Sequence, residues 1–166
     1  YVDSVDVLDG FDEAGKPMLR APVRPVTLRH LLTHTSGFAY RSWNGDMARY
    51  CVEVNVPDMF EGRLAGIMTP LACDPGERWE YGISTDWVGQ LIERLTDQPL
   101  DQYIGEQILM PLGMLDTGFV LHPAVRARFG ELFSRGADGR FAAIPFEEPP
   151  ASEFYGGGGD LYSTAP

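Results

Sequence analysis

The chain has little lysine and a shortage of positive charge. Lys16 is the only lysine among 166 residues, and 13 Lys and Arg side chains stand against 24 Asp and Glu, a formal net charge of −11. A nucleic-acid partner is not expected, because phosphate binding needs a basic surface. The same deficit argues against binding to an anionic membrane surface. No apolar run approaches the roughly 20 residues that span a bilayer, so no membrane segment is expected either.

Cysteine is scarce too. Cys51 and Cys73 are the only two, too few for a disulfide framework. We therefore expect two free thiols, which suits a reducing compartment such as the cytoplasm. The 44% of hydrophobic residues excludes a disordered chain, whereas 19 Gly and 13 Pro predict an ordered fold rich in loops.

Several motifs of catalytic chemistry are missing. A Ser-x-x-Lys nucleophile needs a lysine three residues after a serine, and Glu13 stands three residues before Lys16. No Lys-Thr-Gly occurs. The glycine run at 156–159 is not followed by Lys-Ser or Lys-Thr, so it is no phosphate loop. It is interpreted as a tight turn or a place where backbone approaches another group closely.

One pair of side chains has the spacing of metal ligands. His30 and His34 are four residues apart, which would put them on one helix face. A zinc site needs more protein ligands than such a pair provides. The two are therefore interpreted as structural histidines, and neither a metal nor another cofactor is expected.

Hydrophobic spacing predicts several short helices. Thr27 is placed to cap a helix over 27–35, with Gly37 ending it in the left-handed conformation. Apolar stripes follow at 47–54, more weakly at 64–71, and at 100–108. The clearest stripe starts after Ser84 or Thr85, either of which is expected to be the N-cap, and ends before Pro99.

The remaining segments show weaker patterns. Residues 1–25 read as an acidic, turn-rich lead-in, with turn signals at Asp9-Gly10 and at Gly15. Short strands are expected at 129–133 and 141–144. Ser163 or Thr164 followed by Pro166 has the pattern of a helix start, so the chain is expected to be cut at both ends.

Four stretches, taken in order, carry a family resemblance. They are VTLRHLLTHTSG at 26–37, DPGERWEY at 74–81, QLIERLTDQPL at 90–100 with MPLGM and DT after it, and the glycine run with its Ser-Thr at 156–164. Together they resemble the serine β-lactamase-related hydrolases, which include class C β-lactamases, DD-peptidases and class VIII esterases. The resemblance implies an α+β fold of the β-lactamase/transpeptidase type, of which residues 1–166 would be a partial domain, mainly its helices and loops. The segments with Ser-x-x-Lys and with Lys-Thr-Gly or His-x-Gly would lie outside it.

The resemblance places the family's catalytic tyrosine at Tyr81. A serine hydroxyl is a weak nucleophile until a base takes its proton. A phenol ordinarily has a pKa near 10, so it acts as that base at neutral pH only beside cations. Lysines of the other motifs would supply them.

One departure from the family pattern bears on the substrate. β-Lactamases and DD-peptidases usually have Tyr-x-Asn, whereas this chain has Ile83 at the third position and Asp86 further on. This favours a carboxylic ester cleaved through an acyl-serine intermediate. A β-lactamase or DD-peptidase, or a noncatalytic binding member of the fold, remains the alternative. Besides Tyr81 and Ile83, the expected pocket residues are Trp79, Tyr155, Gly156, Gly157, Gly158 and Gly159.

Overall fold

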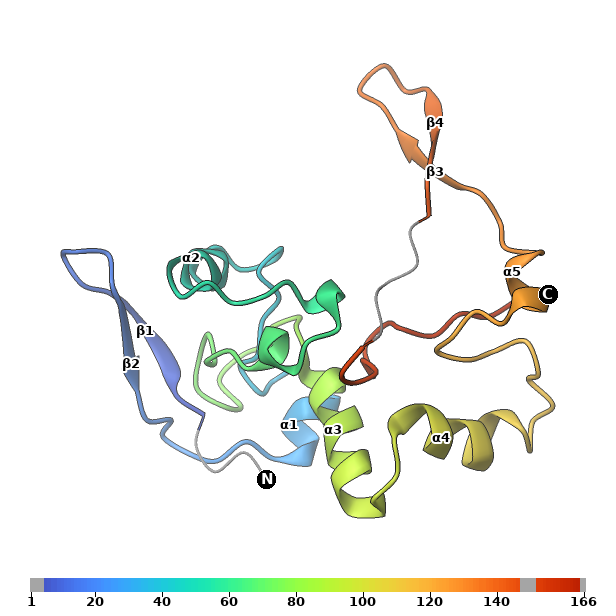
Figure 1. The fold of residues 1–166 in the computed structure, drawn as a ribbon. Helices are drawn as coiled ribbons and strands as arrows, with labels where there is room; N and C mark the ends of the chain where they lie inside the picture. Colours follow the sequence, from blue (N-terminus) through green and yellow to red (C-terminus); the bar gives the residue numbers. More distant parts are fainter. Residues whose placement is uncertain (1–4, 147–151, 165–166) are drawn as a thin grey trace.

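The computed structural model describes residues 5–146 and 152–164 of the chain. Two antiparallel hairpins stand at opposite ends of a group of short helices (Figure 1). The elements are β1 (Val7–Phe11), β2 (Pro17–Arg20), α1 (Leu28–Leu32), α2 (Gly45–Glu53), the 3₁₀ helices η1 (Met59–Glu61) and η2 (Leu64–Ile67), α3 (Ser84–Thr96), α4 (Leu100–Ile104), the π-helical η3 (Gly105–Leu109), α5 (Pro123–Arg126), β3 (Leu132–Arg135) and β4 (Phe141–Ile144). None of the described helices is long and apolar enough to cross a membrane.

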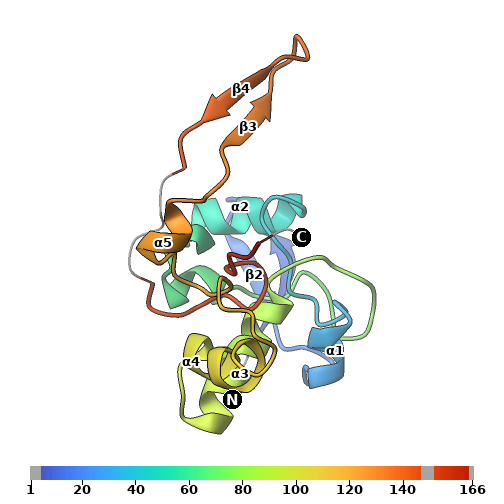
Figure 2. The ribbon, with the colours of Figure 1, turned by 90° about the vertical axis from the view of Figure 1, so that its right-hand side faces the viewer.

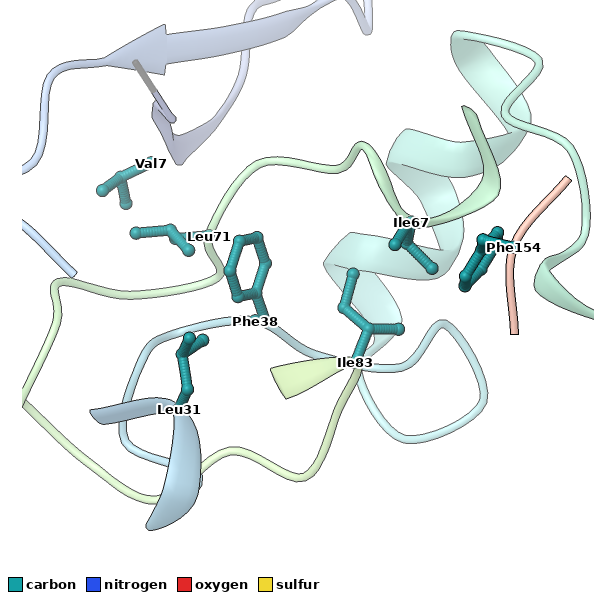
Figure 3. Close-up of a cluster of buried hydrophobic side chains, with 7 residues drawn as sticks. All are labelled: Val7, Leu31, Phe38, Ile67, Leu71, Ile83 and Phe154. Atoms are coloured by element: carbon teal, nitrogen blue, oxygen red, sulfur yellow. The ribbon is translucent and has the colours of Figure 1, made fainter. Parts of the chain in front are cut away.

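The main core is assembled from segments far apart in the sequence. Figure 3 shows its buried side chains, which come from β1, α1, η2, the final segment and the loops between them: Val7, Leu31, Phe38, Ile67, Leu71, Ile83 and Phe154. A second cluster, Leu8 with Met47, Tyr50 and Cys51, fills the space between β1 and α2. Loops supply as much of the core as helices do, as the Gly and Pro content predicts.

The chain nevertheless leaves much of its surface open. Its accessible area is 10904 Å², whereas a compact monomer of 18.4 kDa exposes roughly 8,000 Å². The β3–β4 hairpin accounts for part of the excess, because it projects away from the other elements (Figure 2). All eight residues of its two strands are exposed.

Of the two turns expected in the lead-in at residues 1–25, the one at Gly15 is confirmed and the one at Asp9-Gly10 was wrong. Residues 7–20 form the β1–β2 hairpin, and Asp9-Gly10 lies within β1. Gly10 has a φ of +104°, at the point where the strand pairing shifts register between Leu8 and Phe11. Gly10 was expected to mark a turn and instead lies in a β-bulge, which like many turns needs a residue with positive φ. The turn itself lies at 12–15, where Asp12 accepts the N–H groups of Ala14 and Lys16.

The helix expected at 27–35 is present but shorter. Thr27 caps it as predicted, its side chain accepting the His30 N–H, and the His30 Nδ1 accepts the Thr27 N–H in return. The helix ends at Leu32, because His34 itself takes the left-handed conformation, with φ 52°. His30 and His34 therefore do not share a helix face, which removes the geometry of a metal pair.

The cap expected for α3 was wrong. The helix begins at Ser84, so Ile83 is its N-cap residue and no side chain caps it. The Ser84 hydroxyl instead shares a 2.8 Å hydrogen bond with the buried hydroxyl of Ser36. The hydroxyl of Ser84 therefore bonds to a residue 48 positions away in the sequence and does not cap its own helix.

Other boundaries moved as well. Of the stripe at 64–71 only Leu64–Ile67 is helical, as 3₁₀ turns, and the helix at 100–108 changes to π geometry after Ile104. The strand at 141–144 is confirmed, and its partner begins at Leu132 rather than at 129. Ser163 shares a hydrogen bond with Thr117, and the Pro166 expected to open a helix lies outside the described residues.

Candidate active site

Tyr81 lies on the loop before α3, within a group of aromatic rings. Its ring centroid is 5.2 Å from that of Tyr40, 5.9 Å from that of Trp43 and 6.0 Å from that of Trp79. The centroid of the His34 ring is also 5.2 Å from that of Tyr81. The Tyr81 backbone is fixed too, because its carbonyl accepts the Tyr40 N–H at 3.1 Å. These contacts hold the ring while leaving 39% of the residue exposed.

A cleft of about 620 Å³ opens beside this group of rings. Its walls come from the 39–43 loop, α2, η1 and the glycine turn, and they are mostly apolar or aromatic. The lining residues are Ala39, Tyr40, Arg41, Ser42, Trp43, Met47, Ala48, Cys51, Val52, Asp58, Met59, Phe60, Gly66, Thr69, Tyr81, Ile83, Gly158, Gly159 and Asp160. Apolar walls with a few polar groups are typical of small-molecule sites.

Four of the residues expected at the pocket line this cleft: Tyr81, Ile83, Gly158 and Gly159. Ile83 is only 3% exposed and also belongs to the main core. Trp79 is not among the lining residues and stacks on Tyr81 at an interplanar angle of 13°.

Tyr155, Gly156 and Gly157 lie away from the cleft lining. Tyr155 packs against Phe119, with ring centroids 5.0 Å apart. The two glycines contact the first turn of α3 instead. A Cβ on Gly157 would collide with the Thr85 carbonyl oxygen, and one on Gly156 would lie 2.7 Å from an oxygen of Asp86. The interpretation of the run as a close backbone approach is thereby confirmed.

Asp86 is the group that the glycine turn approaches. It is 1% exposed, and its carboxylate accepts the Gly158 N–H at 3.1 Å and the Tyr40 hydroxyl at 3.5 Å. Asp160, on the glycine turn, accepts the Gly156 N–H at 2.6 Å. Burial, reinforced by the negative charge of Asp160, raises the pKa of Asp86 to about 6. Burial also raises the pKa of Tyr40, with the Asp86 charge adding to it, so Tyr40 stays a neutral donor.

The short sequence at 35–37 has a structural role. Ser36 is fully buried, bonds to Ser84 and accepts the Phe38 N–H at 3.2 Å. It thereby joins the loop that carries Tyr40 to the start of α3. Neither serine is accessible to a substrate, since both have 0% exposure.

The described residues offer no metal site. Within 5–146 and 152–164 no group of three or more His, Cys, Asp or Glu side chains is placed to hold an ion. Cys51 and Cys73 are both free and buried, and burial raises the pKa of each thiol.

The site residues that sequence reasoning missed come from the loop after Gly37. Tyr40 and Trp43 line the cleft and contact Tyr81, and the aromatic density of 38–43 was the available signal. The sequence marks Asp86 only as the acidic residue that follows Ile83 where the family pattern usually has Tyr-x-Asn.

The sequence of this chain is similar to those of known proteins. The family model described as Beta-lactamase matches residues 14–166. The chain belongs to this family. Monacolin J acid methylbutanoyltransferase of Aspergillus terreus is 39% identical to it over 143 residues, which are 84% of this chain and 35% of that protein. Lovastatin esterase of Penicillium rubens is 36% identical over 130 residues, 76% of this chain and 33% of that protein.

Solved structures agree with this membership. Unliganded simvastatin synthase (LovD) from Aspergillus terreus superimposes with a TM-score of 0.83 at 36% identity, over 98% of this chain and 40% of that one. EstCE1, a hydrolase with promiscuous acyltransferase activity, gives 0.66 at 20% identity over 92% of this chain and 44% of that one, which shows the fold alone. The expected α+β fold of the β-lactamase/transpeptidase type is confirmed. This β-lactamase-family chain spans between 33% and 44% of the length of these four proteins.

Proposed function

We propose that this chain is the central part of a serine hydrolase domain that cleaves carboxylic esters, with Tyr81 as general base. The observation that carries the proposal is the place of Tyr81, half-exposed at an apolar cleft in a chain of the β-lactamase family. The relatives named above include an esterase and an acyltransferase, both of which act on acyl groups. The nucleophilic serine and the lysines would come from segments outside these 166 residues, with Ser-x-x-Lys on one and Lys-Thr-Gly or His-x-Gly on another.

The proposed reaction has two halves. The Tyr81 phenolate takes the serine proton as the serine oxygen attacks the ester carbonyl, and the phenol returns that proton to the departing alkoxide. The acyl-serine is then attacked by water, whose proton passes to Tyr81 and on to the serine oxygen. Acid and alcohol are released and the protein is unchanged.

Ile83 supports esters over β-lactams as substrates. Its side chain is buried in the core and carries no polar atom, so it offers the substrate no amide contact of the kind that an Asn gives. We therefore expect hydrolysis of 4-nitrophenyl butyrate and little hydrolysis of nitrocefin. Efficient turnover of nitrocefin would support the β-lactamase alternative.

The first test is Tyr81→Phe in the full-length protein. Loss of a general base lowers kcat by about 10²- to 10⁴-fold, whereas the unfolding temperature should stay the same, because the ring contacts remain. Tyr103→Phe, on α4 and outside the cleft lining, is the matched control. Near-normal kcat in Tyr81→Phe would show that Tyr81 is not the base, and an inactive wild-type protein would favour a noncatalytic binding role.

A second candidate function is acyl transfer to an alcohol. It is favoured by the 39% identity to a methylbutanoyltransferase and by the likeness to simvastatin synthase. The first half-reaction is the same, and an alcohol hydroxyl replaces water in the second. Adding cyclohexanol to 4-nitrophenyl butyrate separates the two functions: a transferase forms cyclohexyl butyrate, and an esterase forms butyrate alone.

A further inference from the structure

Asp86 occupies an unusual environment for a carboxylate. Fully buried aspartates are rare unless a cation pairs with them, and burying a charge without compensation is costly. The groups that face the Asp86 carboxyl in the described residues are the backbone N–H groups of Gly158 and of Asp86 itself, the Tyr40 phenol and a second carboxylate, Asp160. Gly156 has no side chain, and an oxygen of each carboxylate lies within 2.8 Å of the position that its Cβ would take.

Asp86 joins two walls of the cleft. It accepts the Tyr40 hydroxyl, and Tyr40 contacts Tyr81 through its ring and its backbone N–H. It also accepts the Gly158 N–H and so fixes the glycine turn, which lines the cleft with Gly158 and Gly159. In Figure 1 this turn lies against the start of α3, the helix that carries Asp86.

We propose that Asp86 is a positioning residue, which holds Tyr40 against Tyr81 and the glycine turn against α3 and thereby sets the reactive geometry at Tyr81. The inference rests on the proposed function, because it gives Tyr81 a reacting role. Asp86 is not among the residues that line the cleft, so it is assigned a positioning role and not a catalytic one. Its effect passes through two neighbours that do line it.

The activity test compares three changes in the full-length protein. Asp86→Ala removes both contacts, and a displacement of about 1 Å at a reactive group lowers kcat by about 10²-fold. Asp86→Asn keeps the shape and one acceptor, so it should recover most of kcat. Tyr40→Phe removes only the contact with Tyr40 and should lower kcat less than Asp86→Ala. KM should change little in all three, because the apolar walls of the cleft are kept.

A second readout needs no activity. In wild-type protein the amide resonance of Gly158 should titrate with a midpoint near pH 6, as Asp86 ionises. Asp86→Asn should abolish this titration. Asp160→Asn, the matched control, should keep it and move the midpoint down, because a neighbouring negative charge is removed. The Tyr40→Phe variant keeps the experiment informative if Asp86→Ala does not fold.

The outcomes separate the two ideas. The positioning role is supported if the Gly158 amide titrates with Asp86 and if the variants lose kcat while KM changes little. If the wild-type protein cleaves esters and both Asp86→Ala and Tyr40→Phe have the wild-type kcat, the positioning role is overturned and the proposed function stands. A protein that cleaves no ester refutes the proposed function, and a Gly158 amide that does not respond to Asp86 refutes the network independently.

Discussion

The two hairpins of this chain have similar strands and opposite surroundings. In β1, Val7 is 1% exposed within the main core and Leu8 is 8% exposed within the second cluster. The backbone of β1 also pairs beyond its hairpin, since the Leu8 N–H donates to the Leu71 carbonyl at 2.8 Å. Within the described part of the chain, β3 and β4 pair only with each other, and every residue of these two strands is exposed. An isolated two-stranded hairpin is marginally stable in water, so the first is anchored by tertiary contacts that the second lacks.

Charge extends the same contrast. Arg20 of β2 bonds to Asp9 at 3.0 Å and to Asp74 at 2.7 Å, and Asp74 also accepts the Val23 N–H. These bonds tie the first hairpin to the loop that leads to Tyr81. The ion pair near the second hairpin's turn, Arg140 with Asp138, stays within that hairpin. Among the residues that the structure describes, ion pairs therefore connect the first hairpin, and not the second, to the loop before Tyr81.

The largest expected difference concerns hydrogen exchange. Amides of β1 and β2 should exchange through global opening, and those of β3 and β4 through local fraying. With ordinary domain stabilities the rates should differ by about 10³-fold or more. Native-state exchange followed by NMR measures this residue by residue. Equal protection in the two hairpins would mean that burial does not explain the difference between them.

The next largest effect is on stability. Leu71 is fully buried beside β1, so Leu71→Ala should lower the free energy of unfolding by about 2–5 kcal/mol. Leu132→Ala, the same change in β3 where the side chain is 41% exposed, should cost less than about 0.5 kcal/mol. Urea unfolding monitored by circular dichroism compares them. Similar losses in both variants would break the contrast.

The smallest expected effect is electrostatic. The hydrogen bonds from Arg20 hold the pKa of Asp74 below its usual value, so this carboxylate favours the folded state above the unfolded pKa of about 4. The contribution is lost as the pH falls through the lowered folded value. Asp74→Asn should therefore lower the unfolding temperature slightly at pH 6, and the difference from the wild-type protein should shrink as the pH is lowered below 4. The control is Arg140→Gln, which removes an exposed ion pair and should leave the unfolding temperature unchanged at every pH. Equal shifts of the unfolding temperature in the two variants would contradict a stabilising role for Asp74.

Local signals predicted some features well and failed at others. The Thr27 cap depends on groups three residues apart, and the stripe of α3 lies within one helix, so both were readable. The β1–β2 hairpin was missed because its strands are short, its glycine lies in a bulge, and the backbone partner of β1 outside the hairpin is Leu71, which is distant in the sequence. Ser84 was misassigned because a distant serine competes for its hydroxyl.

The candidate site also has features that the sequence predicted and features that it did not. The order of four motifs was enough to indicate the family and to select Tyr81. The cleft around it depends on Tyr40, Trp43 and the glycine turn, and only two of the four glycines line it. Sequence spacing does not say which side of a turn faces a cleft and which faces a helix.

By itself, the sequence determined the family, the short amphipathic helices and the identity of the candidate base. These follow from residue types at short, fixed spacings. The tertiary structure decided the surroundings of Asp86, whose partners Tyr40 and Gly158 are 46 and 72 residues away. The burial that raises its pKa exists only when these segments meet, because a carboxylate in the unfolded chain is solvated by water.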